Sequence, residues 1–233
     1  MEPLNRRQAF RAAGAFALAA GVIPAAADAA TRPRFTVTIR NVATDKTLQL
    51  PDGRTTGAPI SPGVYVVAPT PNVLFKLGSF NRADYALERL AEDGNFRPML
   101  AKVSAMKGLT ASGMFVPGQP FTFTAAPGDL LEFATMFVQS NDLFFAPRDG
   151  GIALFDAGGR AVHGNVTSRV GLFDAGTEMN QAPGVGPDQA PRQAGPNYGP
   201  RERYAIDLVV NRHDGFTYPP VEAVIQVEIE PAC

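Results

Sequence analysis

Residues 121–138 read FTFTAAPGDLLEFATMFV, and this stretch decides the fold class. Its first four residues alternate Phe and Thr, as a strand with one buried face does. Pro127 and Gly128 then predict a turn. Residues 130–138 are apolar on both faces, which is typical of a central strand. Two strands joined by a Pro-Gly turn indicate an antiparallel sheet.

Similar patterns lie on both sides of this stretch. The last of them, at 224–229, places Ile225, Val227 and Ile229 on one face and polar residues on the other, which is typical of a strand with one wet face. We expect further strands at 35–39, 64–67, 151–155, 170–173 and 204–210, and short helices at 84–92 and about 99–106. Seven or eight strands, with helices confined to one insertion, predict an all-β antiparallel sandwich.

Three acidic residues lie at or near the ends of these strands. Asp142 closes a polar corner after the central strand, Asp174 follows an apolar run, and Glu178 comes four positions later. The simplest partner for such acids, with little Lys nearby, is a hard cation with oxygen ligands. Gly176 would let the chain curl and return Glu178 towards Asp174. The alternative is that Asp142 and Asp174 are turn formers that bond their own backbone.

Taken together, these residues resemble the spondin domain, the module of F-spondin and of exported bacterial proteins. The resemblance covers roughly residues 34–231 and is carried by Ser140-Asn-Asp142, by Asp174-Ala-Gly-Thr-Glu178 and by PPVEAVIQVEI at 219–229. It implies an eight-stranded antiparallel sandwich similar to a C2 domain. It also implies one Ca²⁺ ion held at one end by Asp142, Asp174 and Glu178. Glu178 stands where animal members have Asp, so its extra methylene must be absorbed by a shift of the loop.

The resemblance implies adhesion or recognition of an envelope or extracellular ligand, and not an enzyme. The loop 181–203 is rich in Pro, Gly, Gln and Asn. Its composition alone is compatible with a flexible linker, whereas the resemblance favours an ordered loop over one end of the sandwich. Two alternatives stay open. One is a hydrolase of envelope polysaccharide that uses Asp142 with Asp174 or Glu178. The other is a calcium-dependent module that touches a membrane through Phe144.

Composition argues against several other classes. A net charge of −1 lacks the concentrated basic face that nucleic acid requires. The chain has two histidines, His163 and His213, and one cysteine, Cys233, too few for an ordinary zinc or copper site. It has no Gly-x-Ser-x-Gly motif of serine hydrolases. With no intrachain disulfide available, the core must stabilise the domain by burial, and we expect a monomer.

The first 29 residues have the pattern of an export signal. Arg6, Arg7 and Arg11 precede an apolar segment at 12–23, and small residues at 25–29 offer a cleavage site. The paired arginines are similar to those of a twin-arginine signal. We therefore expect a sandwich domain over residues 30–233 that is periplasmic or secreted.

Overall fold

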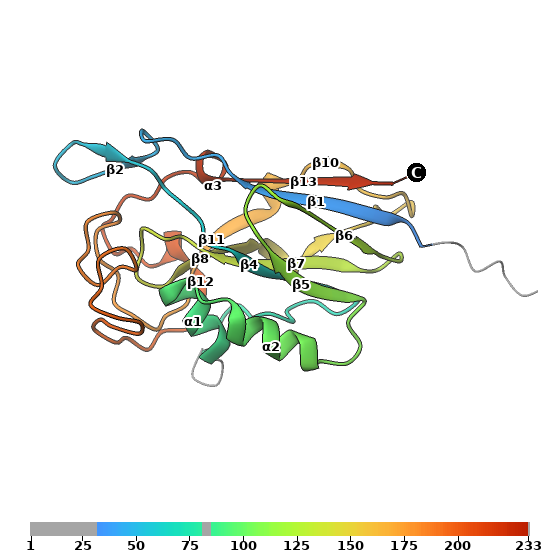
Figure 1. Ribbon diagram of the computed structural model, residues 1–233, viewed down its shortest axis with the longest axis horizontal. Coiled ribbons are helices and arrows are strands. Elements are labelled where there is room, and N and C mark those ends of the chain that lie inside the picture. Colours follow the sequence, from blue (N-terminus) through green and yellow to red (C-terminus); the bar gives the residue numbers. More distant parts are fainter. Residues whose placement is uncertain (1–31, 81–84, 233) are drawn as a thin grey trace, which may run out of the picture. The chain divides into compact units, whose positions relative to one another are not determined.

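The computed structural model describes residues 32–80 and 85–232, so the expected export signal at 1–29 lies outside the described residues. Within the described part, two antiparallel sheets face each other and two helices cover the outer side of one sheet (Figure 1). None of the helices in 32–80 and 85–232 is long and apolar enough to cross a membrane. The β-sandwich expected from the sequence is thus present, while the eight-stranded C2-like topology stays a prediction.

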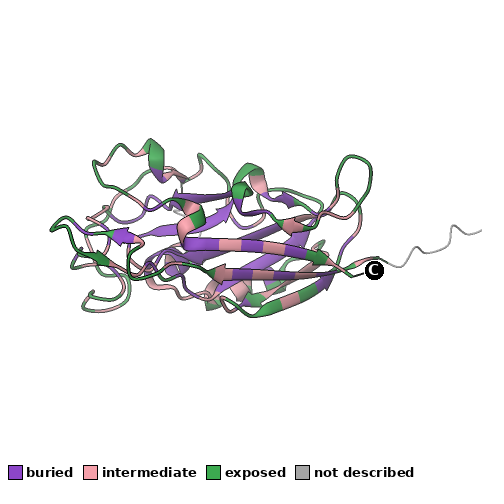
Figure 2. Ribbon diagram, turned by 90° about the horizontal axis from the view of Figure 1, so that it is seen from above, coloured by how far each residue is buried: buried purple, intermediate pink, exposed green. Residues whose placement is uncertain are grey.

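The smaller sheet has the strand order β10-β13-β1-β6. Its strands are β1 (Arg34–Asn41), β6 (Pro120–Thr124), β10 (Gly164–Asn165) and β13 (Ile225–Pro231). Strand β1 pairs antiparallel with both β13 and β6. Figure 2 looks onto this sheet and shows buried residues alternating with half-buried and exposed ones, the pattern of a sheet with one wet face.

The larger sheet has the order β12-β11-β8-β7-β4-β5, with β9 paired to β7. Its strands are β4 (Gly63–Ala68), β5 (Ala111–Phe115), β7 (Leu130–Met136), β8 (Leu143–Pro147), β9 (Ile152–Ala153), β11 (Val170–Asp174) and β12 (Asp207–Leu208). A separate hairpin pairs β2 (Leu48–Gln49) with β3 (Thr55–Thr56). The strands of the larger sheet pair antiparallel.

The central strands of the larger sheet, β4, β7, β8 and β11, are apolar on both faces because each face lies against a different core. In β4, Tyr65 and Val67 face the core between the sheets, whereas Val64 and Val66 face a second core. Helices α1 (Tyr85–Asp93) and α2 (Arg97–Ala105) close that second core with Leu87, Leu90, Met99 and Val103. Three layers therefore explain the central strand predicted from the sequence.

Most predicted elements are present within a few residues of their expected bounds. The predicted strands at 35–39, 64–67, 121–124, 130–138, 170–173 and 224–229 correspond to β1, β4, β6, β7, β11 and β13, and the two helices correspond to α1 and α2. A short helix, α3 (Val221–Val224), precedes β13. Strands β5 and β8 were not predicted from the sequence.

Two predicted strands are wrong in extent. Of residues 151–155, only Ile152–Ala153 is a strand. The range 204–210 contains only β12, after which the chain turns into a 3₁₀ helix at Val209–Asn211. Among the described residues, Arg148–Gly150 and Thr167–Arg169 also form 3₁₀ helices.

Candidate metal centre

Asp142 and Asp174 lie together because β8 and β11 pair side by side. In their register Asp174 is opposite Leu143, the first residue of β8. Asp142 directly precedes Leu143, and the backbone N–H of Ala175 donates to its carbonyl oxygen at 3.2 Å. Both aspartates are fully buried, with 0 % of their surface exposed. The predicted pair of aspartates therefore meets at one end of the sandwich.

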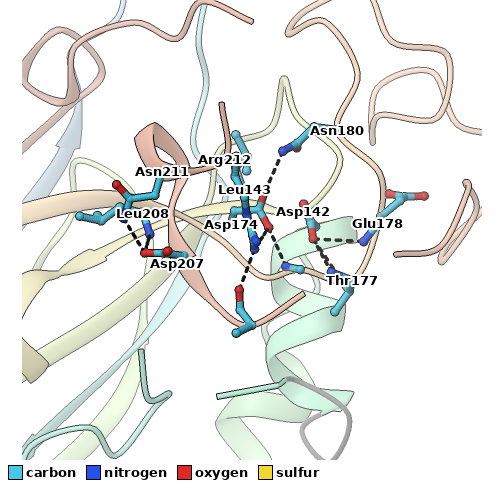
Figure 3. A network of polar contacts seen from close by, with 12 residues as sticks. Asp142, Leu143, Asp174, Thr177, Glu178, Asn180, Asp207, Leu208, Asn211 and Arg212 are labelled. Atoms are coloured by element: carbon cyan, nitrogen blue, oxygen red, sulfur yellow. Dashed lines mark hydrogen bonds and ion pairs between the residues drawn. The ribbon is translucent and has the colours of Figure 1, made fainter. Parts of the chain in front are cut away.

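One carboxylate oxygen of Asp142 accepts hydrogen bonds, and the other accepts none from the described residues. Its Oδ2 accepts hydrogen bonds from the backbone N–H of Thr177 (2.7 Å), the Thr177 hydroxyl (3.1 Å) and the backbone N–H of Glu178 (3.1 Å) (Figure 3). Its Oδ1 is buried and has no hydrogen-bond partner among the described residues. An unpartnered buried oxygen of this kind is costly unless some further group pairs with it.

Asp174 is held by side chains from two loops. The Nη2 of Arg212 donates to its Oδ1 at 2.7 Å, and the backbone N–H of Gly176 donates to the same oxygen at 2.7 Å. The side-chain amide of Asn180 donates to its Oδ2 at 2.7 Å. Figure 3 shows Arg212 and Asn180 approaching Asp174 from different segments of the chain.

Glu202 is the third acid of the cluster, a residue that the sequence analysis did not single out. One carboxylate oxygen each from Asp142, Asp174 and Glu202 lie within 4.8 Å of one another. Glu202 reaches this position because residues 200–204 run alongside 176–179, with backbone hydrogen bonds from Glu202 to Thr177 (3.1 Å) and from Tyr204 to Gly176 (3.1 Å). No sequence pattern pointed to it, since it lies at the end of the long irregular loop.

The three carboxylates repel one another in a poorly solvated place. Burial raises the pKa of Asp142 well above its ordinary value, and the nearby Asp174 carboxylate raises it further. Burial, and then the charge of Asp174, raise the pKa of Glu202 to about 7. The positive charge of Arg212 opposes this shift at Glu202. Three carboxylates against one guanidinium leave an excess of two negative charges when all are ionised.

These features fit a divalent cation with oxygen ligands. The spacing of the three oxygens lets one ion touch all of them, and the unpartnered Oδ1 of Asp142 offers it a ligand. Carboxylate-rich sites of irregular geometry suit Ca²⁺, which accepts six to eight oxygens, better than Mg²⁺, which requires a near-ideal octahedron. Asp142, Asp174 and Glu202 would hold such an ion.

Glu178, the third ligand expected from the sequence, does not belong to this cluster. Its backbone N–H donates to Asp142, but its side chain points away from Asp174 (Figure 3). The side chain is 1 % exposed, and its Oε2 has no hydrogen-bond partner among the described residues. Burial, and then the charge of Glu92 on α1, raise the pKa of Glu178 to about 8. The structure thus brings together two of the three predicted ligands, and the third acid of the cluster is Glu202 and not Glu178.

Hydrogen bonds and ion pairs hold the loop 181–203 against α1. Arg201 donates to Glu92 at 2.7 Å and to Glu88 at 2.8 Å. Asp93 accepts hydrogen bonds from the side chain of Gln193 (2.9 Å) and the backbone of Asn197 (3.0 Å). These contacts agree with the interpretation of an ordered loop, and they fix the segment that carries Glu202.

Comparison with known proteins gives no family assignment. No protein-family model matches the chain, and no curated protein matches it.

Proposed function

We propose that this protein is an exported calcium-binding β-sandwich module that recognises a ligand at the cell envelope or outside the cell. The observation that carries the proposal is the unpartnered Oδ1 of Asp142, buried beside Asp174 and Glu202. The resemblance to the spondin domain supports calcium and a role in recognition. The export-signal pattern of residues 1–29 supports a periplasmic or secreted location.

The site fits a structural metal ion better than it fits the catalytic acids of a hydrolase. Asp142 and Asp174 are both fully buried, so a polysaccharide could not reach them as it must reach the acid and base of a glycosidase. The hydrogen bonds from Thr177 and Asn180 hold their carboxylates in place. An ion here would join the β8 and β11 ends to the segment that carries Glu202.

Membrane contact through Phe144 finds no support. Phe144 is 0 % exposed and packs edge to face with Phe75 and stacked with Phe173, inside the core beneath the helices. A side chain enclosed in this way cannot insert into lipid.

Thermal unfolding with and without calcium tests the proposal. The midpoint of the full chain is measured in EDTA, in about 1 mM Ca²⁺ and in about 1 mM Mg²⁺. An ion at a hundred times its dissociation constant stabilises by about 2.7 kcal/mol, which corresponds to a rise of roughly 5–10 °C for a chain of this size.

The matched variants are Asp142→Asn, which removes a proposed ligand charge, and Asp45→Asn, which removes an exposed acid that is not part of the cluster. The proposal expects Asp142→Asn to lose the response to Ca²⁺ and Asp45→Asn to keep it. Equal midpoints in EDTA and Ca²⁺ for the parent protein would refute the proposed site.

A further inference from the structure

A pocket of about 510 Å³ opens directly beside the metal centre. Its size lies within the usual range for small-ligand sites. Glu202 belongs both to the carboxylate cluster and to the wall of this pocket, so one side chain connects the two. The pocket wall includes Glu202, Tyr204, Asn180, Asn211, Asp214 and Phe216, and we call it the Tyr204 pocket.

Aromatic faces are available in the Tyr204 pocket. Tyr204 is 58 % exposed and Phe216 is 37 % exposed. The Cζ of Arg212 lies 5.3 Å from the centre of the Tyr204 ring, which helps to hold the ring in place. Exposed aromatic side chains at a pocket are typical of recognition surfaces, because the ring is apolar while its edge and hydroxyl are polar.

Hydrogen-bonding groups lie next to these rings. The amide of Asn180 donates to Asp174 at 2.7 Å and also to Asp214 at 3.2 Å. Asp214 in turn accepts a hydrogen bond from the hydroxyl of Tyr218 at 2.6 Å. A chain of hydrogen bonds therefore runs from the metal centre through Asn180 to the wall of the Tyr204 pocket.

The charge of the Tyr204 pocket favours a neutral ligand over ionic ones. Its wall has two carboxylates, Glu202 and Asp214, and one guanidinium, Arg212, which is already paired with Asp174. With a divalent ion bound, the charges of Asp142, Asp174, Glu202, Arg212 and the ion cancel, and Asp214 leaves one negative charge, so a polyanion is still not attracted. A divalent ion at the adjacent centre would disfavour a cationic ligand. A neutral ligand rich in hydroxyl groups satisfies both conditions.

We propose that the Tyr204 pocket binds neutral carbohydrate, as the ligand of the calcium-dependent recognition module proposed above, on which this inference rests. Sugar C–H groups pack on the Tyr204 and Phe216 rings, whose faces carry partial negative charge. Sugar hydroxyls donate to Glu202 and Asp214 and bond to the amides of Asn180 and Asn211. Calcium strengthens binding because it holds Glu202 and Asp174 in place. Asn180, which donates to both Asp174 and Asp214, passes this restraint on to the pocket wall.

The test uses the full chain and immobilised oligosaccharides. The panel contains neutral gluco-, galacto- and manno-configured oligosaccharides, beside carboxylated and sulfated ones, each in Ca²⁺ and in EDTA. We expect binding to at least one neutral class, weakened at least about tenfold by EDTA. The Ca²⁺-induced rise in unfolding midpoint is measured on the same samples, so the ion and the sugar are tested separately.

Single variants then locate the binding. Phe216→Ala removes one ring without touching the Arg212 contact, and Tyr204→Ala removes the other; each should weaken sugar binding about tenfold. Tyr198→Ala is the matched control, because Tyr198 is 54 % exposed and does not line the Tyr204 pocket. Phe216→Ala should keep the full Ca²⁺ response.

Each result decides between the two proposals. A Ca²⁺ response without binding to any neutral oligosaccharide overturns the carbohydrate inference and leaves the calcium module standing. Binding confined to carboxylated or sulfated sugars also overturns it, as does equal loss in Tyr198→Ala and Phe216→Ala. Sugar binding that is lost in Phe216→Ala, in a protein with no Ca²⁺ response, refutes the proposed function while supporting the Tyr204 pocket as the sugar site.

Discussion

Arg212 and Asp174 form an ion pair at the edge of the carboxylate cluster, with 2.7 Å between Nη2 and Oδ1. The aspartate side chain is fully buried and that of the arginine is 14 % exposed. The same Nη2 also donates to the carbonyl oxygen of Ala205 at 2.8 Å. The guanidinium of Arg212 therefore neutralises part of the negative charge of the cluster. It also links Asp174 to the segment that leads into β12.

Replacing Arg212 by Gln should make folding strongly dependent on calcium. Removing one partner of a buried ion pair costs about 3–5 kcal/mol, because the remaining charge is left unpaired. We expect a loss of that order in EDTA. In saturating Ca²⁺ the loss should be smaller, since the ion takes over the neutralisation of Asp174. Denaturant unfolding in both buffers measures the two losses.

Arg203→Gln is the control for this experiment, because Arg203 is an exposed arginine one residue from Glu202. It should change stability by less than about 0.5 kcal/mol. An equal loss of unfolding free energy in EDTA and in Ca²⁺ for Arg212→Gln would contradict this prediction. It would mean that the ion does not neutralise the carboxylate that Arg212 neutralises.

The stability of the protein should fall as pH rises, and it should fall more steeply without calcium than with it. Burial raises the folded-state pKa of Glu202 to about 7 and that of Glu178 to about 8, from an ordinary value of 4.5. Between pH 5 and 8 the folded state then holds more protons than the unfolded state, so stability falls as pH rises. In EDTA the unfolding midpoint should be higher at pH 5.5 than at pH 8.

With Ca²⁺ present this fall should become shallower, because the ion binds ionised carboxylates and so removes the proton of Glu202 from the folded state, while Glu178 keeps its own. The rise in midpoint caused by Ca²⁺ should shrink as pH falls from 8 to 6. A Ca²⁺ response that stayed constant over this range would contradict the participation of Glu202.

Gly199 should not tolerate a methyl group, because the Glu178 carboxylate occupies the space. A Cβ built on Gly199 would lie 1.6 Å from Oε1 of Glu178. The Gly199→Ala variant must displace either the loop or this buried side chain, which we expect to cost roughly 1–3 kcal/mol. Gly195→Ala is the matched control in the same loop, since nothing lies within 4 Å of its Cβ. Equal stability of the two alanine variants would mean that the loop does not pack on Glu178.

The sequence predicted those parts of the fold that repeat a pattern. Alternation identified β1, β6 and β13, and the continuous apolar run identified β7 as a strand covered on both faces. It failed at 204–210, where chain pairing and not side-chain periodicity decides the structure. Short pairings such as β12 depend on their neighbours and leave little trace in the local sequence.

The candidate site was predicted only in part, because some of its residues are placed by contacts between distant segments of the chain. Asp142 and Asp174 follow from strand ends, which the sequence marks. The direction of the Glu178 side chain does not follow from its spacing, because Gly176 has a φ of +68° and turns the chain between the two acids. Glu202 comes from a loop whose course is set by contacts with α1, such as the pair between Arg201 and Glu92. Spacing along the chain cannot show such contacts.

Substituting Glu202 and Glu178 one at a time distinguishes the ligand set of the structure from that implied by the spondin resemblance. Glu202→Gln removes a carboxylate whose oxygen lies within 4.8 Å of the Asp142 and Asp174 oxygens, and it should abolish most of the Ca²⁺-induced rise in midpoint. Glu178→Gln keeps the backbone N–H that donates to Asp142 and removes a buried charge with a raised pKa. It should therefore retain the Ca²⁺ response, and at pH 8 it should be no less stable than the parent protein in EDTA.

The reverse result has an equally definite meaning. Loss of the Ca²⁺ response in Glu178→Gln, with the response kept in Glu202→Gln, would show that the ion turns the Glu178 side chain towards Asp174. The buried space beside Gly199 would then have to open when calcium binds, and Gly199→Ala would become less destabilising in Ca²⁺ than in EDTA. Measuring Gly199→Ala in both buffers thus gives an independent check on which of the two glutamates completes the site.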